Sequence, residues 1–230
     1  MAGLVSASNS NWATMMAAAM PKPAVKKDEK SYEYCSWPAS ESYVKDQSVG
    51  DGIFETLKKA TPHAIYGGVG ADKPELRLIV AWDKTESHTA FTKSPEYAVL
   101  GGSVKKTFAN PEAPGMYMVH IHFEEDPTKL FDAGVTEIVR FTPKEGYTLD
   151  DARAVVKSIQ AKISGRPVNV GSQVGTIEEE PEKLLFLVGW KGWEEYQKFR
   201  QEPVLTAEFF GEIGQKGDIA IDYSFLSKKQ

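Results

Sequence analysis

The sequence predicts an α+β fold made of two similar halves in tandem, each with the element order β-α-β-β-α-β. The first observation behind this prediction is a strand–helix segment that occurs twice, at 76–100 and at 184–207. Three landmarks of the segment recur at a constant offset of 108 residues: Trp82 and Trp190, Phe91 and Phe199, and Pro95 and Pro203. The second observation is the length of 230 residues, which suits two domains of about 100 residues each. Together they indicate a tandem duplication.

Composition and charge exclude several classes of partner. The formal net charge of −5 leaves no basic footprint for nucleic acid. No run approaches the roughly 18 apolar residues that a membrane span requires. The single cysteine, Cys35, cannot form an internal disulfide and fits a reducing compartment, so we expect a cytoplasmic protein. Within its strand-like run, Cys35 is better explained as a small core residue than as a nucleophile.

Residues 1–30 are predicted to be a disordered N-terminal tail. They are rich in Ala, Met and Ser, and no Lys or Arg precedes Lys22. A secretory signal needs a basic start and a continuous apolar stretch, and a mitochondrial presequence needs arginine. The segment has neither pattern, so we assign it no folded element.

The first half is predicted to span residues 31–127. An apolar stripe over Asp51–Ala60 indicates a helix, which a Thr-Pro pair ends. A second helix carries His88 and Phe91, and 40–50 is expected to be a polar connection. The expected strands of this half are 31–38, 63–70, 76–82 and 116–123.

The second half, residues 128–230, repeats that order. Thr148 and Asp151 have the spacing of a capping box and mark the start of a long amphipathic helix. A second helix carries Tyr196 and Phe199, and the acidic turn at 178–180 is expected to be a solvated hairpin tip. The expected strands are 135–141, 168–177, 184–190 and 218–225.

The doubled segment also carries a resemblance to a known family. Its first copy reads W-x(5)-H-x(2)-F-x(3)-P and consists of Trp82, His88, Phe91 and Pro95. This spacing resembles the strand–helix signature of the antibiotic biosynthesis monooxygenase-like proteins of the dimeric α/β-barrel superfamily. In the second copy Tyr196 stands where His88 stands in the first. The resemblance covers roughly residues 31–228 and implies two ferredoxin-like halves that form a dimeric-type α/β barrel within one chain.

Histidines are the predicted catalytic residues. His120 and His122 lie on one face of a strand because side chains alternate with period two. Their expected counterparts in the second half are Asp222 and Ser224. Because imidazole titrates near neutral pH, it suits proton abstraction from a phenol or a carbon acid, so His120, His122 and His88 form the predicted catalytic set. The alternative is that they are hydrogen-bonded residues where the two sheets join.

A substrate-binding set is predicted from aromatic and charged residues. Trp82 and Trp190 end their strands and can stack on a planar ligand, although as repeat landmarks they are better explained as core residues. Tyr34 adds an aromatic group, and Arg140 suits a carboxylate or an enolate. Asp222 completes the set. No metal site is predicted, because two histidines on a strand need a third ligand that the sequence does not fix.

The resemblance implies an enzyme of secondary metabolism that acts on a small hydrophobic or aromatic, polyketide-like molecule without an organic cofactor. The reactions in range are oxygenation, isomerisation, cyclisation and decarboxylation, with histidine as acid or base. The alternative is a non-catalytic ligand-binding or stress-associated protein, since one fold serves many functions. Because the two halves differ at the histidines, we expect one site, mainly in the first half.

Two further expectations concern haem and assembly. The haem enzymes of the chlorite dismutase type resemble this chain in length and tandem architecture, and they carry their proximal histidine in the C-terminal half. No histidine follows His122 here, which argues against haem. The fused halves are expected to form a monomeric pseudo-dimer or a homodimer.

Overall fold

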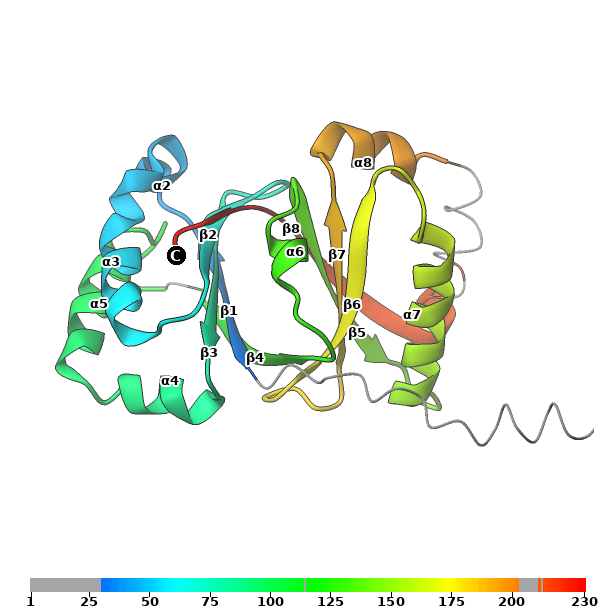
Figure 1. Cartoon of the computed structure of the whole chain (residues 1–230), viewed down its shortest axis with the longest axis horizontal. Coiled ribbons are helices and arrows are strands. Elements are labelled where there is room, and N and C mark those ends of the chain that lie inside the picture. The colour runs from blue at the N-terminus through cyan, green and yellow to red at the C-terminus, as the bar shows by residue number, and fades with distance from the viewer. Residues whose placement is uncertain (1–29, 114, 203–210, 212) are drawn as a thin grey trace, which may run out of the picture.

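The computed structural model describes residues 30–113, 115–202, 211 and 213–230, so residues 1–29 of the predicted tail lie outside the described residues. Eight strands close into one antiparallel barrel in the order β1-β3-β2-β8-β5-β7-β6-β4. The first half contributes the run β4-β1-β3-β2 and the second half the run β8-β5-β7-β6, so the halves join at β2–β8 and at β4–β6. Figure 1 shows the barrel at the centre of the molecule with helices on both sides.

The strand predictions are confirmed to within a few residues. The strands are β1 (Ser31–Pro38), β2 (Ile65–Gly70), β3 (Glu75–Trp82), β4 (Tyr117–Phe123), β5 (Val135–Pro143), β6 (Asn169–Ile177), β7 (Leu184–Trp190) and β8 (Gly217–Lys228). The largest difference is at the end of β8, which runs three residues past the predicted Phe225.

The helices fall into one group for each half. The first half has α2 (Glu41–Lys45), α3 (Asp51–Ala60), α4 (Thr85–Phe91) and α5 (Pro95–Lys105), and the second has α6 (Thr128–Phe131), α7 (Leu149–Ile163) and α8 (Trp193–Arg200). The helices α2 to α5 cover one side of the barrel, and α7 and α8 cover the other (Figure 1).

Local signals placed some helices and missed others. The capping box at Thr148 and Asp151 is present, with Thr148 accepting from the Asp151 backbone N–H and donating to its carboxylate. The expected polar connection at 40–50 was wrong, because it contains α2 and the short 3-10 helix η1 (Gln47–Gly50). No element was predicted over α5, which buries none of its residues and therefore lacks the apolar stripe on which the prediction depends.

Side-chain alternation along the strands divides the core into three parts. On β1, Tyr32 and Tyr34 point into the barrel, whereas Cys35 and Trp37 point outward to the helices of the first half. A third apolar cluster fills the space between the second half's strands and its helices. Each half therefore has its own sheet–helix layer, and the barrel interior is shared. Within the described part of the chain, no helix is long and apolar enough to span a membrane.

Candidate functional site

A buried polar cluster occupies the sheet–helix layer of the first half, where its neighbours are otherwise apolar. Its centre is Glu33, which shares the outward face of β1 with Cys35 and is only 6% exposed. The indole Nε1 of Trp82 donates to Glu33 Oε2 over 2.9 Å, and the Cys35 thiol donates to Glu33 Oε1 over 3.2 Å. This carboxylate is held by two donors from neighbouring strand positions.

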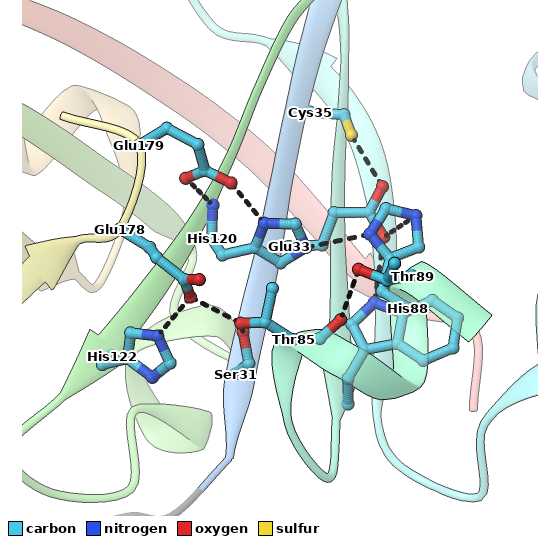
Figure 2. Close-up of polar contacts among 11 residues, drawn as sticks. Ser31, Glu33, Cys35, Thr85, His88, Thr89, His120, His122, Glu178 and Glu179 are labelled. Carbon is cyan, nitrogen blue, oxygen red and sulfur yellow. Dashed lines mark hydrogen bonds and ion pairs between the residues drawn. The ribbon is translucent and has the colours of Figure 1, made fainter. Parts of the chain in front are cut away.

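Two histidines connect this carboxylate to the edge of the barrel, as Figure 2 shows. His88 on α4 stacks on Trp82 and places Nε2 3.6 Å from Glu33 Oε2. Its Nδ1 lies 2.9 Å from His120 Nε2, and His120 Nδ1 lies 2.5 Å from Glu179 Oε1. The backbone N–H of His120 donates to the other oxygen of Glu179 over 2.8 Å. The result is a continuous chain Glu179–His120–His88–Glu33 (Figure 2).

The hydrogen-bond pattern assigns the tautomers of this chain when both imidazoles are neutral. An ionised Glu179 only accepts, so His120 Nδ1 carries the proton and His120 Nε2 accepts from His88 Nδ1–H. His88 Nε2 then presents a lone pair to Glu33, which accounts for a separation of 3.6 Å rather than a hydrogen bond. Burial lowers the pKa of His88, and His120 lowers it further, although Glu33 and Glu179 act in the opposite direction. The neutral form is therefore favoured in the folded protein.

The acidic turn at 178–180 contacts the first half instead of standing free in solvent as expected. Glu178 accepts from Thr85 Oγ1 over 2.6 Å and lies 2.9 Å from His122 Nε2, and these contacts lower its pKa. Glu180 accepts from Tyr117 over 2.7 Å. His122 is thereby placed at the same seam between the halves as His120, but it is more exposed.

The second half repeats the glutamate–tryptophan pair and replaces both histidines with tyrosines. Trp190 Nε1 donates to Glu137 Oε2 over 2.7 Å, as Trp82 does to Glu33. The hydroxyls of Tyr196 and Tyr223 lie 2.6 Å apart.

Strand register corrects the expected counterparts of the histidines. His120 pairs with Glu33, and Tyr223 pairs with Glu137, so Tyr223 and not Asp222 is the equivalent of His120. The sequence alignment was wrong by one residue, and a shift of one residue moves every side chain to the other face of the strand.

An apolar cavity of about 70 Å³ lies between the strands and helices of the second half. Its described lining includes residues of β5, β7, β8, α7 and α8. The lining residues are Glu137, Val139, Ile159, Ile163, Phe186, Val188, Trp190, Tyr196, Phe199, Arg200, Ile213, Ile219, Ile221 and Tyr223. Among the predicted site residues, this set includes Trp190 and no histidine. Trp190 contacts Tyr196 and Phe199 at ring-centroid distances of 5.0 and 5.4 Å, so one wall of the cavity is aromatic.

The electrostatics of this cavity centre on Glu137. Burial raises the pKa of Glu137 to about 7, against the opposing effects of Trp190, Tyr223, Arg200 and Tyr196. Burial and the nearby glutamate also raise the pKa of Tyr223 to about 12 and that of Tyr196 further. Near neutral pH the site therefore holds a carboxyl group that both takes and releases a proton, beside two phenols that stay protonated.

The remaining predicted substrate-binding residues meet inside the barrel. Asp222 accepts from Tyr34 over 3.1 Å, from Arg77 over 3.1 Å and from Arg140 over 2.8 Å. The Arg140 guanidinium also lies over the ring of Tyr117 at 4.3 Å. This network joins strands of both halves and lies on the opposite side of the sheet from the cavity and from the histidine chain.

A second, polar cavity of about 120 Å³ lies at the surface of the second half, beside α7 and β6. Its lining includes Glu124, which pairs with Arg153 at 3.1 Å. No group of three or more His, Cys, Asp or Glu side chains within the described ranges has the arrangement of a metal site.

Sequence reasoning missed Glu137 and Tyr223. One available signal was the recurrence of a glutamate as the third residue of the first strand of each half, Glu33 and Glu137. A carboxylate between Val135 and Val139 on the core face of a strand is costly unless it is paired or functional.

Comparisons with known proteins support the fold and not a particular reaction. No protein-family model and no curated protein sequence matches the chain. A structure named "putative monooxygenase" from Fusobacterium nucleatum is 9% identical, with a TM-score of 0.60 over 86% of this chain and 93% of that one. An anthrone oxidase-like protein is 9% identical, with a TM-score of 0.60 over 90% and 96% of the two chains. A chlorite dismutase homologue, TA0507, is 8% identical, with a TM-score of 0.53 over 87% and 96%. The neighbours are of the dimeric α/β-barrel type, and at these identities the likeness shows the fold alone.

A haem group does not fit the second-half cavity. Its described lining offers no histidine or cysteine to the iron, and its two tyrosine hydroxyls are bonded to each other. Its volume of about 70 Å³ is also well below the roughly 300 Å³ at which ordinary ligand pockets begin.

Proposed function

We propose that this chain is a small-molecule enzyme in which Glu137 transfers a proton inside the apolar cavity of the second half. The observation that carries the proposal is a buried carboxyl group with a pKa of about 7 in the wall of an apolar cavity. A base whose pKa lies near the working pH is both ionised and strong enough to take a proton. Buried titratable groups with such shifts are concentrated at functional sites.

The proposed step is abstraction of a weakly acidic C–H or O–H proton. The bond to hydrogen breaks, its electron pair stays on the substrate as an enolate or phenolate, and Glu137 becomes a carboxylic acid. Tyr196 and Tyr223 line the same cavity, and the hydroxyl whose proton is not used in the bond between them can donate to the developing oxyanion. Return of the proton to a different atom gives isomerisation or cyclisation, and reaction of the carbanion with dioxygen gives oxygenation. Decarboxylation follows the reverse order, with Glu137 protonating the carbanion that loss of carbon dioxide leaves.

The proposal keeps the substrate class that the sequence implied, a small hydrophobic or aromatic molecule. The aromatic wall formed by Trp190, Tyr196 and Phe199 supports a planar substrate. A volume of about 70 Å³ restricts it to a molecule of only a few ring atoms in the deep part of the cavity. We further propose that the chain is a tandem-fused relative of the antibiotic biosynthesis monooxygenase-like proteins, with two ferredoxin-like halves.

The test compares the two matched glutamates. Solvent deuterium exchange into small cyclic ketones, measured by proton NMR at pH 8, is expected to fall at least about 100-fold in Glu137→Gln. The control is Glu33→Gln, which changes the same position of the other half and should retain the wild-type rate. Equal rates in wild type and Glu137→Gln would contradict the proposal.

The histidine site in the first half stays a second proposal for the same reaction class. The chain Glu179–His120–His88–Glu33 is an acid–base arrangement of the kind that orients a catalytic imidazole. Loss of exchange in His120→Asn, with retention in Glu137→Gln, would transfer the site to the first half.

A non-catalytic ligand-binding or stress-associated role is the alternative function, and the small size of the cavity favours it. Calorimetry that shows binding of cyclic ketones and phenols to the wild-type chain, without solvent deuterium exchange into them, would support that alternative. Binding together with Glu137-dependent exchange would exclude it.

A further inference from the structure

Arg200 lies at the end of α8 and lines the cavity at its exposed side, whereas Glu137 lines it from within the core. Within the described lining, Arg200 is the one basic residue and Glu137 the one carboxylic acid. All other lining side chains are apolar or aromatic. The cavity is therefore lined by apolar and aromatic side chains, with one acidic residue in the core and one basic residue at the exposed side.

The charge of Arg200 acts on the interior of the cavity. It lowers the pKa of Glu137 on β5, of Tyr196 on α8 and of Tyr223 on β8, in each case against the larger effect of burial. Three groups on three elements thus lie within electrostatic reach of one guanidinium. Since field lines are concentrated by low-dielectric walls, an anion that enters the cavity is attracted to the same group.

Within the described part of the chain, the carboxylates on and next to α8 do not pair with Arg200. Glu202, two residues away, pairs with Arg166 at 3.6 Å, and that guanidinium also lies over Phe199. Glu194 and Glu195 are in the first turn of α8, at the opposite end of the helix. Among the described residues, Arg200 forms no ion pair within 4.0 Å.

We propose that the substrate is a small apolar acid whose anionic group binds Arg200 at the rim while its apolar body enters the cavity toward Glu137. This inference rests on the proposed function for the reacting end of the molecule. A planar guanidinium binds a carboxylate through two parallel hydrogen bonds. The acidic group is excluded from the deep end, because an ionised Glu137 would repel it.

The test uses the full chain and pairs of probes that differ only in charge. Isothermal titration calorimetry at pH 8 compares pentanoate with pentanamide, and benzoate with benzamide. In the wild type each acid is expected to bind at least about tenfold more tightly than its amide. Arg200→Gln should remove this preference, and Arg200→Lys should retain part of it. Lys198→Gln is the control, since Lys198 is exposed on the same helix and does not line the cavity.

Two results would overturn the inference: equal affinity for acid and amide in the wild type, or an undiminished preference in Arg200→Gln. A failure of the proposed function is distinguished by a separate measurement. The preference for acids is also measured in Glu137→Gln, a variant that the proposed function expects to lose deuterium exchange while Arg200 is unchanged. Unchanged turnover in that variant, with the preference for acids retained, rejects Glu137 as the base and leaves Arg200 as an anion-binding residue.

Discussion

Each half of the molecule buries one glutamate against one tryptophan, yet only one of these glutamates lines the apolar cavity described above. Glu33 accepts from Trp82 and Glu137 accepts from Trp190 at equivalent positions of β1 and β5. Glu33 also accepts from Cys35 and faces the His88 ring. Glu137 stands beside a cavity of about 70 Å³.

The difference comes from the second pair of residues in each half. His88 and His120 extend the polar cluster toward the surface and end on Glu179. Tyr196 and Tyr223 bond to each other, so they close the polar network and leave the rest of the layer apolar. The comparison teaches that similar strand–helix arrangements give a buried carboxylate different surroundings, according to the residues that hydrogen-bond around it.

The largest expected effect contrasts the stabilities of the two glutamate variants. The pKa of Glu137 is raised from 4.5 to about 7, so the folded state holds a proton that the unfolded state has lost between these values. Stability from this group is fully present below pH 4.5 and is lost as the pH rises through 7. Glu137→Gln should therefore increase the free energy of unfolding by about 3 kcal/mol at pH 8 and hardly at all at pH 4.5.

Urea unfolding at the two pH values measures this effect, with Glu33→Gln as the matched variant. Glu33 accepts from Trp82 and Cys35, and an amide has a single oxygen to offer them, so that variant should lose about 1 kcal/mol. A loss of stability in Glu137→Gln at pH 8 would contradict this, and would show that hydrogen bonds stabilise the ionised Glu137 carboxylate as they do that of Glu33.

A smaller effect is expected from copying the second half's residues into the first. Burial lowers the pKa of His88 below 6.5, so the unfolded chain binds a proton that the folded chain does not. Stability from this group is present above pH 6.5 and falls as the pH decreases through that value. His88→Tyr should remove this pH-dependent part of the stability. The urea concentration at the unfolding midpoint should then change less between pH 7.5 and pH 5.5 than it does in the wild type.

Because a tyrosine beside His120 could disturb packing, the double variant His88→Tyr with His120→Tyr serves as the second test. It reproduces the hydroxyl pair of Tyr196 and Tyr223. An unchanged pH dependence in both variants would mean that His88 is not the group responsible.

The smallest effect concerns the acidic turn at 178–180, where Glu179 bonds to His120, whereas Asp72 at the equivalent place of the other seam acts on Tyr223 only through its charge. Glu179 is 42% exposed, so its bonds to His120 are partly screened by water. Glu179→Ala should lower the free energy of unfolding by about 1 kcal/mol or less. Glu182→Ala, an exposed position in the same turn, is the control. If both variants lose the same free energy of unfolding, the loss belongs to the turn in general and not to the contact between Glu179 and His120.

The sequence by itself determined the order of the strands and of the helices that carry an apolar stripe, and it shows the doubled strand–helix segment. Apolar runs and turn residues act over a few positions, so β1, β7 and α3 were predicted with their observed bounds, and the capping box fixed the start of α7. The same local signals identified Trp82 and Trp190 as equivalent, because each ends its strand before a similar helix.

Only the tertiary structure decided which residues meet. Glu179 follows His120 by 59 residues, and Asp222 follows Arg77 by 145, so no local pattern connects them. The register of β8 was also beyond the sequence, because apolar and polar residues alternate on it in a way that fits either alignment, and one step exchanges Asp222 for Tyr223. The doubled segment in the sequence located the strands and helices around Trp82 and Trp190. Packing in the folded chain determined that histidines fill the layer of the first half and that the layer of the second half encloses a cavity.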